Sequence, residues 1–270
     1  MDQDFDETAY LAANADVAAA VRRGEIDSGS KHYELYGRYE GRPLKLPATE
    51  YNSNLKPDWL ILPPFNFNHP TVAKYSPEVT GRIILKSMCE RLGWPSLAGK
   101  RLLDFGCGVR FTRTIVNLEL DVGQYAGVDV NPEPIAWLKE NVVSPTFRFE
   151  HINMRNPMYN PSGDIPPAGT LTDFGFAGFD AACMFSVITH QDPEEAALIF
   201  SMLRPVAQRL YFTAIIDNDV DIYTERSEAS PRLQSIFSTD AITKLLHGAS
   251  WKLEKIFEPS LFQQTVFICS

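Results

Sequence analysis

The chain has 270 residues, of which 44% are hydrophobic, 22% charged and 11% aromatic. This is the composition of an ordinary globular protein, and it excludes a disordered or fibrous chain. The formal net charge of -9 argues against a protein that binds nucleic acid through its phosphates. No apolar run approaches the roughly 20 residues that cross a bilayer, and the acidic start MDQDFDETAY is unlike a signal peptide. We therefore expect a cytoplasmic protein without a membrane span.

Cysteine spacing argues against a zinc site. The four cysteines form no C-x-x-C pair, and each has apolar neighbours in the sequence. We expect buried, reduced thiols and no bound metal. They are Cys89, Cys107, Cys183 and Cys269.

Residues 1–42 have a helical pattern. Gly24 is expected to end one helix, and Ser28 or Ser30 to begin the next. About 40 residues rarely fold alone, so this module should dock on the rest of the chain, on a second copy or on another partner. Its stretches FDETAYLAANADVAAAV and HYELYGRYEGR resemble a small module fused to bacterial glycan-modifying enzymes and surface proteins. That resemblance implies no particular reaction.

Residues 43–75 combine six prolines with large apolar side chains such as Trp59 and Phe65. The prolines exclude a long helix, and the apolar residues are unlike a solvated linker. Two interpretations stay open, a strap over the core and a lid over a pocket.

From residue 76 onward, strands and helices alternate. Helices are predicted to start at Ser76-Pro77, with Ile84, Met88 and Leu92 on one face, and to run over 111–118, 131–141, 192–204 and 238–246. Strands are predicted over 101–105, 125–130, 147–152, 181–187, 210–216, 251–257 and 265–269, the last two as a hairpin.

This alternation predicts an α/β domain with a mostly parallel sheet covered on both faces. Ligands of such sheets bind beyond the C-terminal ends of the strands. The loops after Phe105, Val128, Ile152 and Phe185 should therefore form one cleft.

The strongest motif is RLLDFGCGVR, in which an apolar strand ends in Asp104 and turns through Gly106 and Gly108 toward a helix. Glycines let a ligand approach the backbone, and a helix N-terminus favours an anionic group. A dinucleotide site would have a third glycine where Phe111 stands. An acid before the glycines suits a cationic amine, and Asp129, at the end of the next strand, suits a ribose diol.

These features make residues 76–270 similar to class I S-adenosylmethionine-dependent methyltransferases. The matching segments are LLDFGCG, YAGVDVNPEPIAWLKENV, FEHIN, MFSVITHQDPEEA and LRPVAQRLYFTAI, followed by the terminal hairpin. The resemblance implies a Rossmann-like sheet of seven strands, mostly parallel with the last strand antiparallel. It also implies S-adenosylmethionine as the cofactor.

The resemblance assigns cofactor-binding roles residue by residue. Asp104, Gly106 and Gly108 would line the methionine end, Asp129 would hold the ribose, and Asn153 would meet the adenine amino group. The other cofactor-binding candidates lie beside these residues and are Phe105, Arg110, Val130 and Met154.

Two positions depart from the family. Arg110 stands where the family has a third glycine; it either pairs with the cofactor carboxylate or points to solvent. Asn153 stands where the family usually has Asp, so it can accept a hydrogen bond but brings no charge.

The residues after the fourth predicted strand bear on the acceptor. They read SVITHQ, so the N-P-P-Y-like motif of amine methyltransferases of adenine, cytosine and glutamine is absent there; Asn156-Pro157-Met158-Tyr159 is on another loop and is interpreted as a turn. His190 is then the candidate general base, with a cap or packing role as the alternative. Asp217, Asp219 and Asp221 are interpreted as a solvated acidic loop rather than a cation site.

The favoured function is O-methylation of a small molecule or a glycan. The alternatives are N-methylation of a small amine or lipid, and a catalytically inactive module that only binds the cofactor.

Overall fold

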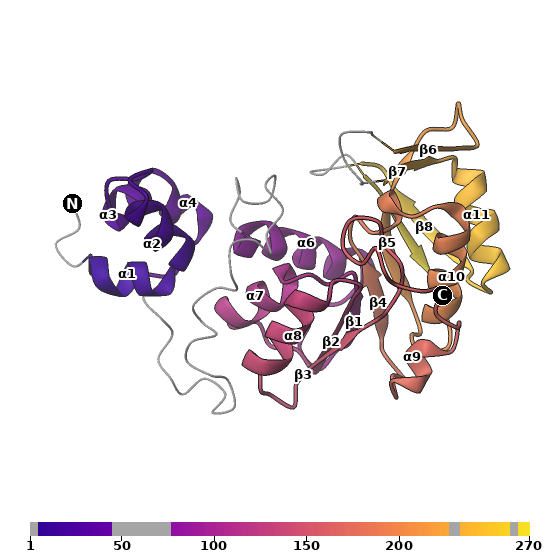
Figure 1. The fold of residues 1–270 in the computed structure, drawn as a ribbon, viewed down its shortest axis with the longest axis horizontal. Helices are drawn as coiled ribbons and strands as arrows, with labels where there is room; N and C mark the ends of the chain where they lie inside the picture. The colour runs from indigo at the N-terminus through magenta and orange to yellow at the C-terminus, as the bar shows by residue number, and fades with distance from the viewer. Residues whose placement is uncertain (1–4, 45–76, 227–232, 260–263) are drawn as a thin grey trace. The chain divides into compact units, whose positions relative to one another are not determined.

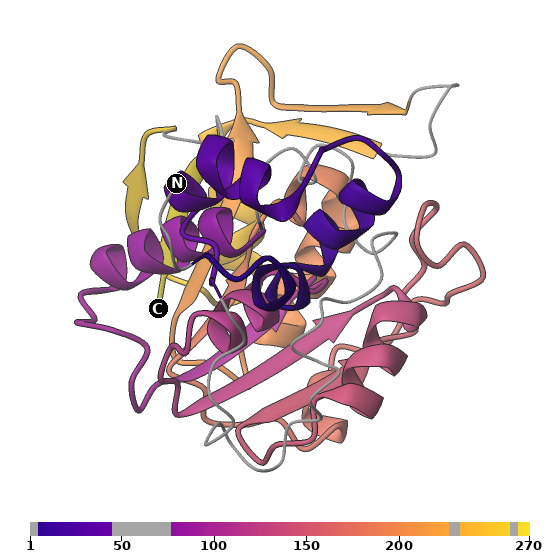
Figure 2. The same ribbon diagram turned by 90° about the vertical axis from the view of Figure 1, so that its left-hand side faces the viewer.

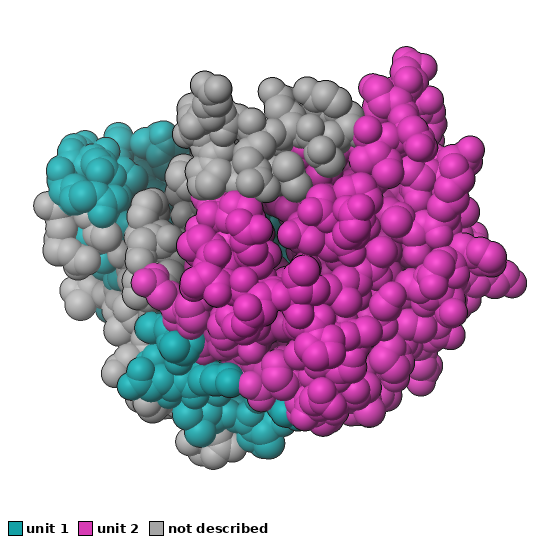
Figure 3. All heavy atoms as spheres, turned by 45° about the vertical axis from the view of Figure 1, so that its right-hand side comes forward, with its two compact units in different colours: residues 1–98, 108–122, 136–148 teal, residues 99–107, 123–135, 149–270 magenta. Residues whose placement is uncertain are grey.

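The computed structural model describes residues 5–44, 77–226, 233–259 and 264–270 (Figure 1). Most of the predicted strap, 43–75, lies outside these described residues. The chain forms two compact units, coloured in Figure 3. The first contains residues 1–98, 108–122 and 136–148, and the second contains residues 99–107, 123–135 and 149–270. None of the described helices is both long and apolar enough to cross a membrane.

The N-terminal helices are short. They are α1 (Glu7–Ala13), α2 (Ala15–Arg22), α3 (Gly29–His32), the π-helical turn η1 (Tyr33–Gly37) and α4 (Arg38–Glu40). The later helices are α6 (Pro77–Leu92), α7 (Arg110–Asn117), α8 (Pro132–Asn141), α9 (Thr170–Asp173), the 3₁₀ turn η4 (Ile188–His190), α10 (Pro193–Leu203) and α11 (Thr239–Gly248).

The strands come close to their predicted positions. They are β1 (Arg101–Phe105), β2 (Gln124–Asp129), β3 (Phe147–His151), β4 (Ala181–Met184), β5 (Leu210–Ile216), β6 (Ile222–Arg226), β7 (Leu233–Phe237), β8 (Leu253–Phe257) and β9 (Thr265–Cys269). Sequence analysis predicted all of them except β6 and β7.

One sheet joins these nine strands in the described part of the chain. Its order is β3-β2-β1-β4-β5-β7-β6, while β9 pairs with β5 and β8 pairs with β9. The pairs β1–β2, β1–β4, β4–β5 and β5–β7 are parallel, and β9 is antiparallel to β5. The predicted mostly parallel α/β sheet with an antiparallel last strand is confirmed.

The predicted number of seven strands is too low, because β6 and β7 add a hairpin (Figure 2). The hairpin is antiparallel, and it joins the sheet where Ile236 and Phe237 of β7 pair with the last residues of β5. Its strands read IYTER and LQSIF. Such short, polar segments lack the continuous apolar run that identified the central strands.

The core of the second unit lies between the central strands and α10 and α11. Phe212 of β5 stacks on Phe267 of β9 with ring centroids 4.9 Å apart. Trp251 is 2% exposed and donates its indole N–H to the carbonyl of Phe200 in α10 at 2.9 Å. The four cysteines are free and buried, as predicted.

In the first unit, α6 and α7 pack closely. The side chain of Thr114 lies so near Gly81 that a Cβ at this glycine would collide with the Thr114 hydroxyl. Ile84, Met88 and Leu92 are buried, which confirms the predicted apolar face of α6.

The N-terminal helices are joined by polar contacts of their own. The carboxylate of Glu7 accepts from the backbone N–H groups of Gly29 at 2.7 Å and Ser30 at 2.8 Å. Ser28 caps α3 through Lys31 N–H at 3.0 Å, as one of the two predicted alternatives. The backbone of Gly24, just after α2, has φ +72°, which is typical of a helix stop.

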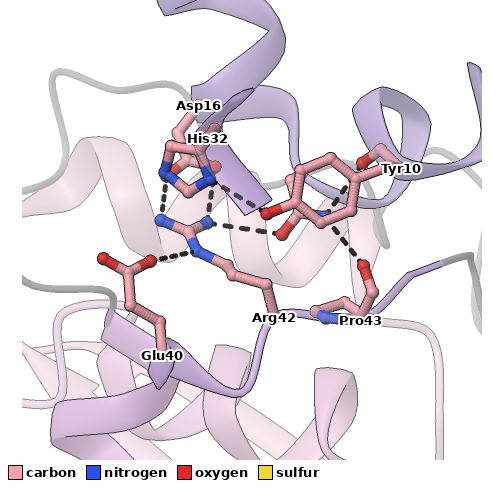
Figure 4. Close-up of polar contacts among 7 residues, drawn as sticks. Tyr10, Asp16, His32, Glu40, Arg42 and Pro43 are labelled. Carbon is pink, nitrogen blue, oxygen red and sulfur yellow. Dashed lines mark hydrogen bonds and ion pairs between the residues drawn. The ribbon is translucent and has the colours of Figure 1, made fainter. Parts of the chain in front are cut away.

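Arg42 is the centre of a second group of contacts (Figure 4). Its guanidinium donates to both carboxylate oxygens of Asp16, at 2.7 and 2.8 Å, and to Glu40 at 2.8 Å. Burial acts to raise the pKa of the Asp16 carboxyl, whereas the positive charge and hydrogen bonds of Arg42 act to lower it. The net result is a lowered pKa. Burial, reinforced by Arg42, lowers the pKa of His32, whose Nδ1 shares a 2.9 Å hydrogen bond with the hydroxyl of Tyr10.

Candidate cofactor site

The glycine turn after β1 is fixed to the end of β2. The backbone N–H groups of Gly106 and Cys107 donate to the carbonyl of Val128 at 2.7 and 3.1 Å. Gly106 has φ +77°, and a Cβ there would run into Val187. Both features require glycine, so the turn approaches β2 and the segment after β4 more closely than any other residue would allow.

Asp104 is 2% exposed, and its carboxylate faces two buried donors. The Tyr125 hydroxyl donates to Oδ2 at 2.6 Å, and the Cys183 thiol lies 3.6 Å from Oδ1. Burial, reinforced by the Asp104 charge, raises the pKa values of the Tyr125 hydroxyl and the Cys183 thiol, so both stay protonated. The structure thus holds Asp104 behind the glycine turn, and its contact with a cofactor amine stays a prediction.

Asp129 ends β2, as predicted, and is half-buried. Its Oδ1 accepts from the backbone N–H of Asn131 at 2.8 Å, which sets the orientation of the carboxylate. The carbonyl of Asp129 accepts from Ile152 N–H at 3.0 Å, and the carbonyl of Val130 lies 3.1 Å from His151 Nε2. These contacts bring the ends of β2 and β3 together.

The other predicted cofactor residues of the second unit differ in exposure. Asn153 is exposed just beyond β3. Phe105 and Met154 are only 2% and 3% exposed, and their side chains belong to the hydrophobic core. The structure gives these two a packing role in holding the strand ends.

Gly108 and Arg110 belong to the first unit, at the start of α7. Gly108 has φ +46°, and among the described residues no atom lies within 4 Å of a Cβ built there. Val109 at the N-cap makes no side-chain capping bond. The Cγ of Arg110 lies beside Gly81 of α6; a role toward a carboxylate stays a prediction.

His190 ends η4, after β4, and is half-buried. Ser186, just before it, has φ +58°, a conformation that costs free energy in residues other than glycine. Two contacts hold it there: its N–H donates to the Thr213 hydroxyl at 2.9 Å, and its hydroxyl accepts from Gln264 at 2.8 Å. Asp192 caps α10 in a capping box with Glu195.

The acidic residues after β5 make hydrogen bonds within their own loop and to the start of α11. Asp217 accepts from Asp219 N–H at 2.9 Å, and Asp221 lies 3.2 Å from the Ser238 hydroxyl that caps α11. Among the described residues, no group of three or more His, Cys, Asp and Glu side chains is placed to hold a metal ion.

The hydrogen-bond partners of the motif residue Asp104 were not identified from the sequence. Cys183 sits opposite Asp104 in the β1–β4 register, and Tyr125 lies two residues before Gly127, the β2 partner of Asp104. Strand register was the available signal, since neighbours across paired strands share a face. Nothing in the sequence indicated that Val187 lies against the glycine turn at Gly106.

No protein-family model matches the chain. A solved glycopeptide N-methyltransferase with bound S-adenosylhomocysteine is 9% identical, with a TM-score of 0.50, and the match covers 70% of this chain and 89% of that one. The 1,6-didemethyltoxoflavin-N1-methyltransferase of Burkholderia thailandensis is 19% identical, with a TM-score of 0.49 and coverage of 74% and 80%. Magnesium protoporphyrin IX methyltransferase of Synechocystis PCC 6803 is 13% identical, with a TM-score of 0.47 and coverage of 88% and 92%.

The sheet order, the antiparallel last strand and the match at a TM-score of 0.50 agree on the architecture. The chain therefore has the fold of S-adenosylmethionine-dependent methyltransferases.

Proposed function

We propose that this protein is an S-adenosylmethionine-dependent methyltransferase that acts on a hydroxyl group of a small molecule or a glycan. One observation carries the proposal: both N–H groups of the glycine turn bind the carbonyl of Val128, next to the strand end where Asp129 stands. This brings a ligand-accessible backbone and an oriented carboxylate to the same edge of the sheet.

The residues present fit an adenosyl cofactor. The carboxylate of Asp129, oriented by Asn131 N–H, would accept from the ribose hydroxyls. The resemblance names Gly108 and Arg110 as candidates for the methionine end, with Arg110 as the partner of its carboxylate. When bound, S-adenosylmethionine supplies an electrophilic methyl group on a sulfonium.

His190 is the proposed general base. A hydroxyl is a poor nucleophile until its proton is removed, and an imidazole titrates near neutral pH. The contacts of Ser186 with Thr213 and Gln264 fix the segment that leads to His190. In this proposal His190 removes the proton of a hydroxyl that is held next to the cofactor methyl group.

The preference for a sugar depends on the resemblance of residues 1–42 to modules of bacterial glycan-modifying enzymes, an association rather than a contact. The other candidate acceptor is a small amine or lipid.

The four free, buried cysteines support a cytoplasmic location.

Asp129→Ala tests the cofactor site. Loss of the charge-assisted hydrogen bonds should weaken S-adenosylhomocysteine binding by about 1.5–3 kcal/mol, measured by isothermal titration calorimetry. Asp121→Ala, which removes an exposed acid shortly before β2, should leave the affinity unchanged. Equal affinities of wild type and a folded Asp129→Ala variant would refute the assignment of this site.

A further inference from the structure

The loop after β3 is folded back tightly on the strand end. The N–H of Asp164 donates to the carbonyl of Asn153 at 2.9 Å, and its carbonyl accepts from Arg155 N–H at 2.8 Å. Asn156 and Asn160 exchange two backbone hydrogen bonds of 2.9 Å within the loop. These bonds fix Asp164 beside the end of β3, eleven positions after Asn153.

Gly163 makes this closure possible. A Cβ at this position would stand 2.7 Å from the backbone of Arg155 and 2.6 Å from the Asn160 amide nitrogen. Backbone atoms cannot yield as a flexible side chain can, so only glycine fits here. The loop is therefore a preformed element rather than a variable connection.

Asn160 fixes the orientation of the Asn153 side chain. Asn160 is 7% exposed, and its Nδ2 donates to the carbonyl of Met154 at 3.2 Å and to Oδ1 of Asn153 at 3.1 Å. Both hydrogens of Nδ2 are thus used. Nδ2 of Asn153 must then point the other way, where it donates to Oδ2 of Asp164 at 3.2 Å. A reversed Asn153 amide would place donor against donor.

This orientation matters for a base that presents an amine. Asn160 uses one of the two acceptor sites of the Asn153 oxygen, and the donor end of Asn153 cannot bind another donor. Asp164 is exposed, and within the described part of the chain its Oδ1 accepts no hydrogen bond. A carboxylate also accepts a stronger hydrogen bond than an amide oxygen.

We propose that Asp164, held by Asn153, is the residue that recognises the exocyclic amine of adenine. The inference rests on the proposed function, because it places the ribose at Asp129. The carbonyl of Asp129 accepts from the N–H of Ile152, the residue before Asn153, so the base beyond that ribose would lie at the Asn153–Asp164 pair. The negative charge that position 153 lacks is supplied from the loop.

Calorimetry with two ligands tests this assignment. S-adenosylhomocysteine presents an amine at the base, and S-inosylhomocysteine presents a carbonyl that would face the carboxylate. Wild type should prefer the first by about 100-fold, the loss expected when a hydrogen bond to a charged group is replaced by an oxygen-to-oxygen contact. Asp164→Asn retains an oxygen for the Asn153 amide but loses the charge, and the preference should fall below about tenfold.

Two further variants separate recognition from loop structure. Asn153→Asp combined with Asp164→Asn exchanges the roles of the two side chains and should restore the preference. Asp173→Asn removes another exposed acid, on α9, and should leave the preference at its wild-type value. Thermal melting without ligand checks that each variant is folded.

The proposal is overturned if wild type binds both ligands equally, or if folded Asp164→Asn keeps the wild-type preference. Failure of the proposed function gives a different result, since wild type would then bind neither ligand.

Discussion

Gly106 must be glycine for two reasons that can be measured separately. Its φ of +77° costs any other residue about 1–2 kcal/mol, and a Cβ would collide with Val187, which adds about 1–3 kcal/mol of overpacking. Gly106→Ala should therefore lower the free energy of unfolding by about 2–5 kcal/mol in urea denaturation. The loss should extend to S-adenosylhomocysteine affinity.

Gly93→Ala is the matched control, because Gly93 has φ +71° and none of the described residues has an atom within 4 Å of the added Cβ. Gly93→Ala should lower the free energy of unfolding only by the cost of a positive φ, without the overpacking term. Adding Val187→Ala to Gly106→Ala should recover part of the difference as a favourable coupling energy. Equal losses for Gly106→Ala and Gly93→Ala would mean that the contact with Val187 is without consequence.

The proposed role of His190 makes a second prediction at this scale. His190→Ala should lower kcat by about 10²–10⁴-fold on an alcohol acceptor that wild type methylates, with S-adenosylhomocysteine affinity nearly unchanged. The acid limb of the wild-type pH profile should disappear, since it reports the protonation of the base. His247→Ala replaces an exposed histidine of α11 and should do neither. A loss below tenfold with the acid limb retained would leave His190 as a packing residue.

Residues with local roles could be identified from the sequence, and residues with long-range roles could not. The glycine turn and Asp129 follow directly from strand ends, which a local pattern reveals. The donors to Asp104 could not be predicted in the same way, because Cys183 comes 79 residues later and depends on the register of β1 with β4. The position of Asp164 could not be predicted either, because it depends on how the loop after β3 folds back onto Asn153 and Arg155.

At the scale of elements, the buried strands were predictable and the edge hairpin was not. β1, β5 and β9 have the predicted bounds, because buried strands require a continuous apolar run. The β6–β7 hairpin depends on tertiary pairing with β5 and on one buried polar contact, from the Ser235 hydroxyl to the carbonyl of Gln191 at 2.6 Å. Neither feature leaves a pattern in a polar sequence.

The start of α10 gives a prediction for an element. Asp192 accepts from Glu195 N–H at 2.8 Å, and Glu195 accepts from Asp192 N–H at 3.0 Å. Asp192→Ala removes this cap and should cost about 0.5–2 kcal/mol of unfolding free energy in urea. Glu194→Ala, in the same helical turn, should cost clearly less, because Glu194 takes no part in the capping box. Equal costs would show that charge in the first turn, rather than the cap, stabilises the helix.

At the scale of the whole molecule, the division into residues 1–42, 43–75 and 76–270 stays a proposal. The N-terminal helices hold each other through Glu7 and through the ion pairs of Arg42. They also expose large apolar side chains: Leu35, Tyr36 and Tyr39 are 50%, 52% and 75% exposed. The sequence predicted a docking module from its small size, and polar contacts among these helices together with exposed aromatic rings support that proposal.

Deleting residues 1–42 tests this division. No residue of the proposed cofactor site lies in this segment, and the ion pairs of Arg42 with Asp16 and Glu40 and of Arg23 with Glu25 join residues within it. S-adenosylhomocysteine affinity, measured by calorimetry, should therefore stay within about twofold of wild type, as for independent sites. The association state in analytical ultracentrifugation or the range of acceptors should change, because the exposed aromatic surface is removed. A truncated protein that melts cooperatively but does not bind the cofactor would show that the N-terminal helices are part of the cofactor site.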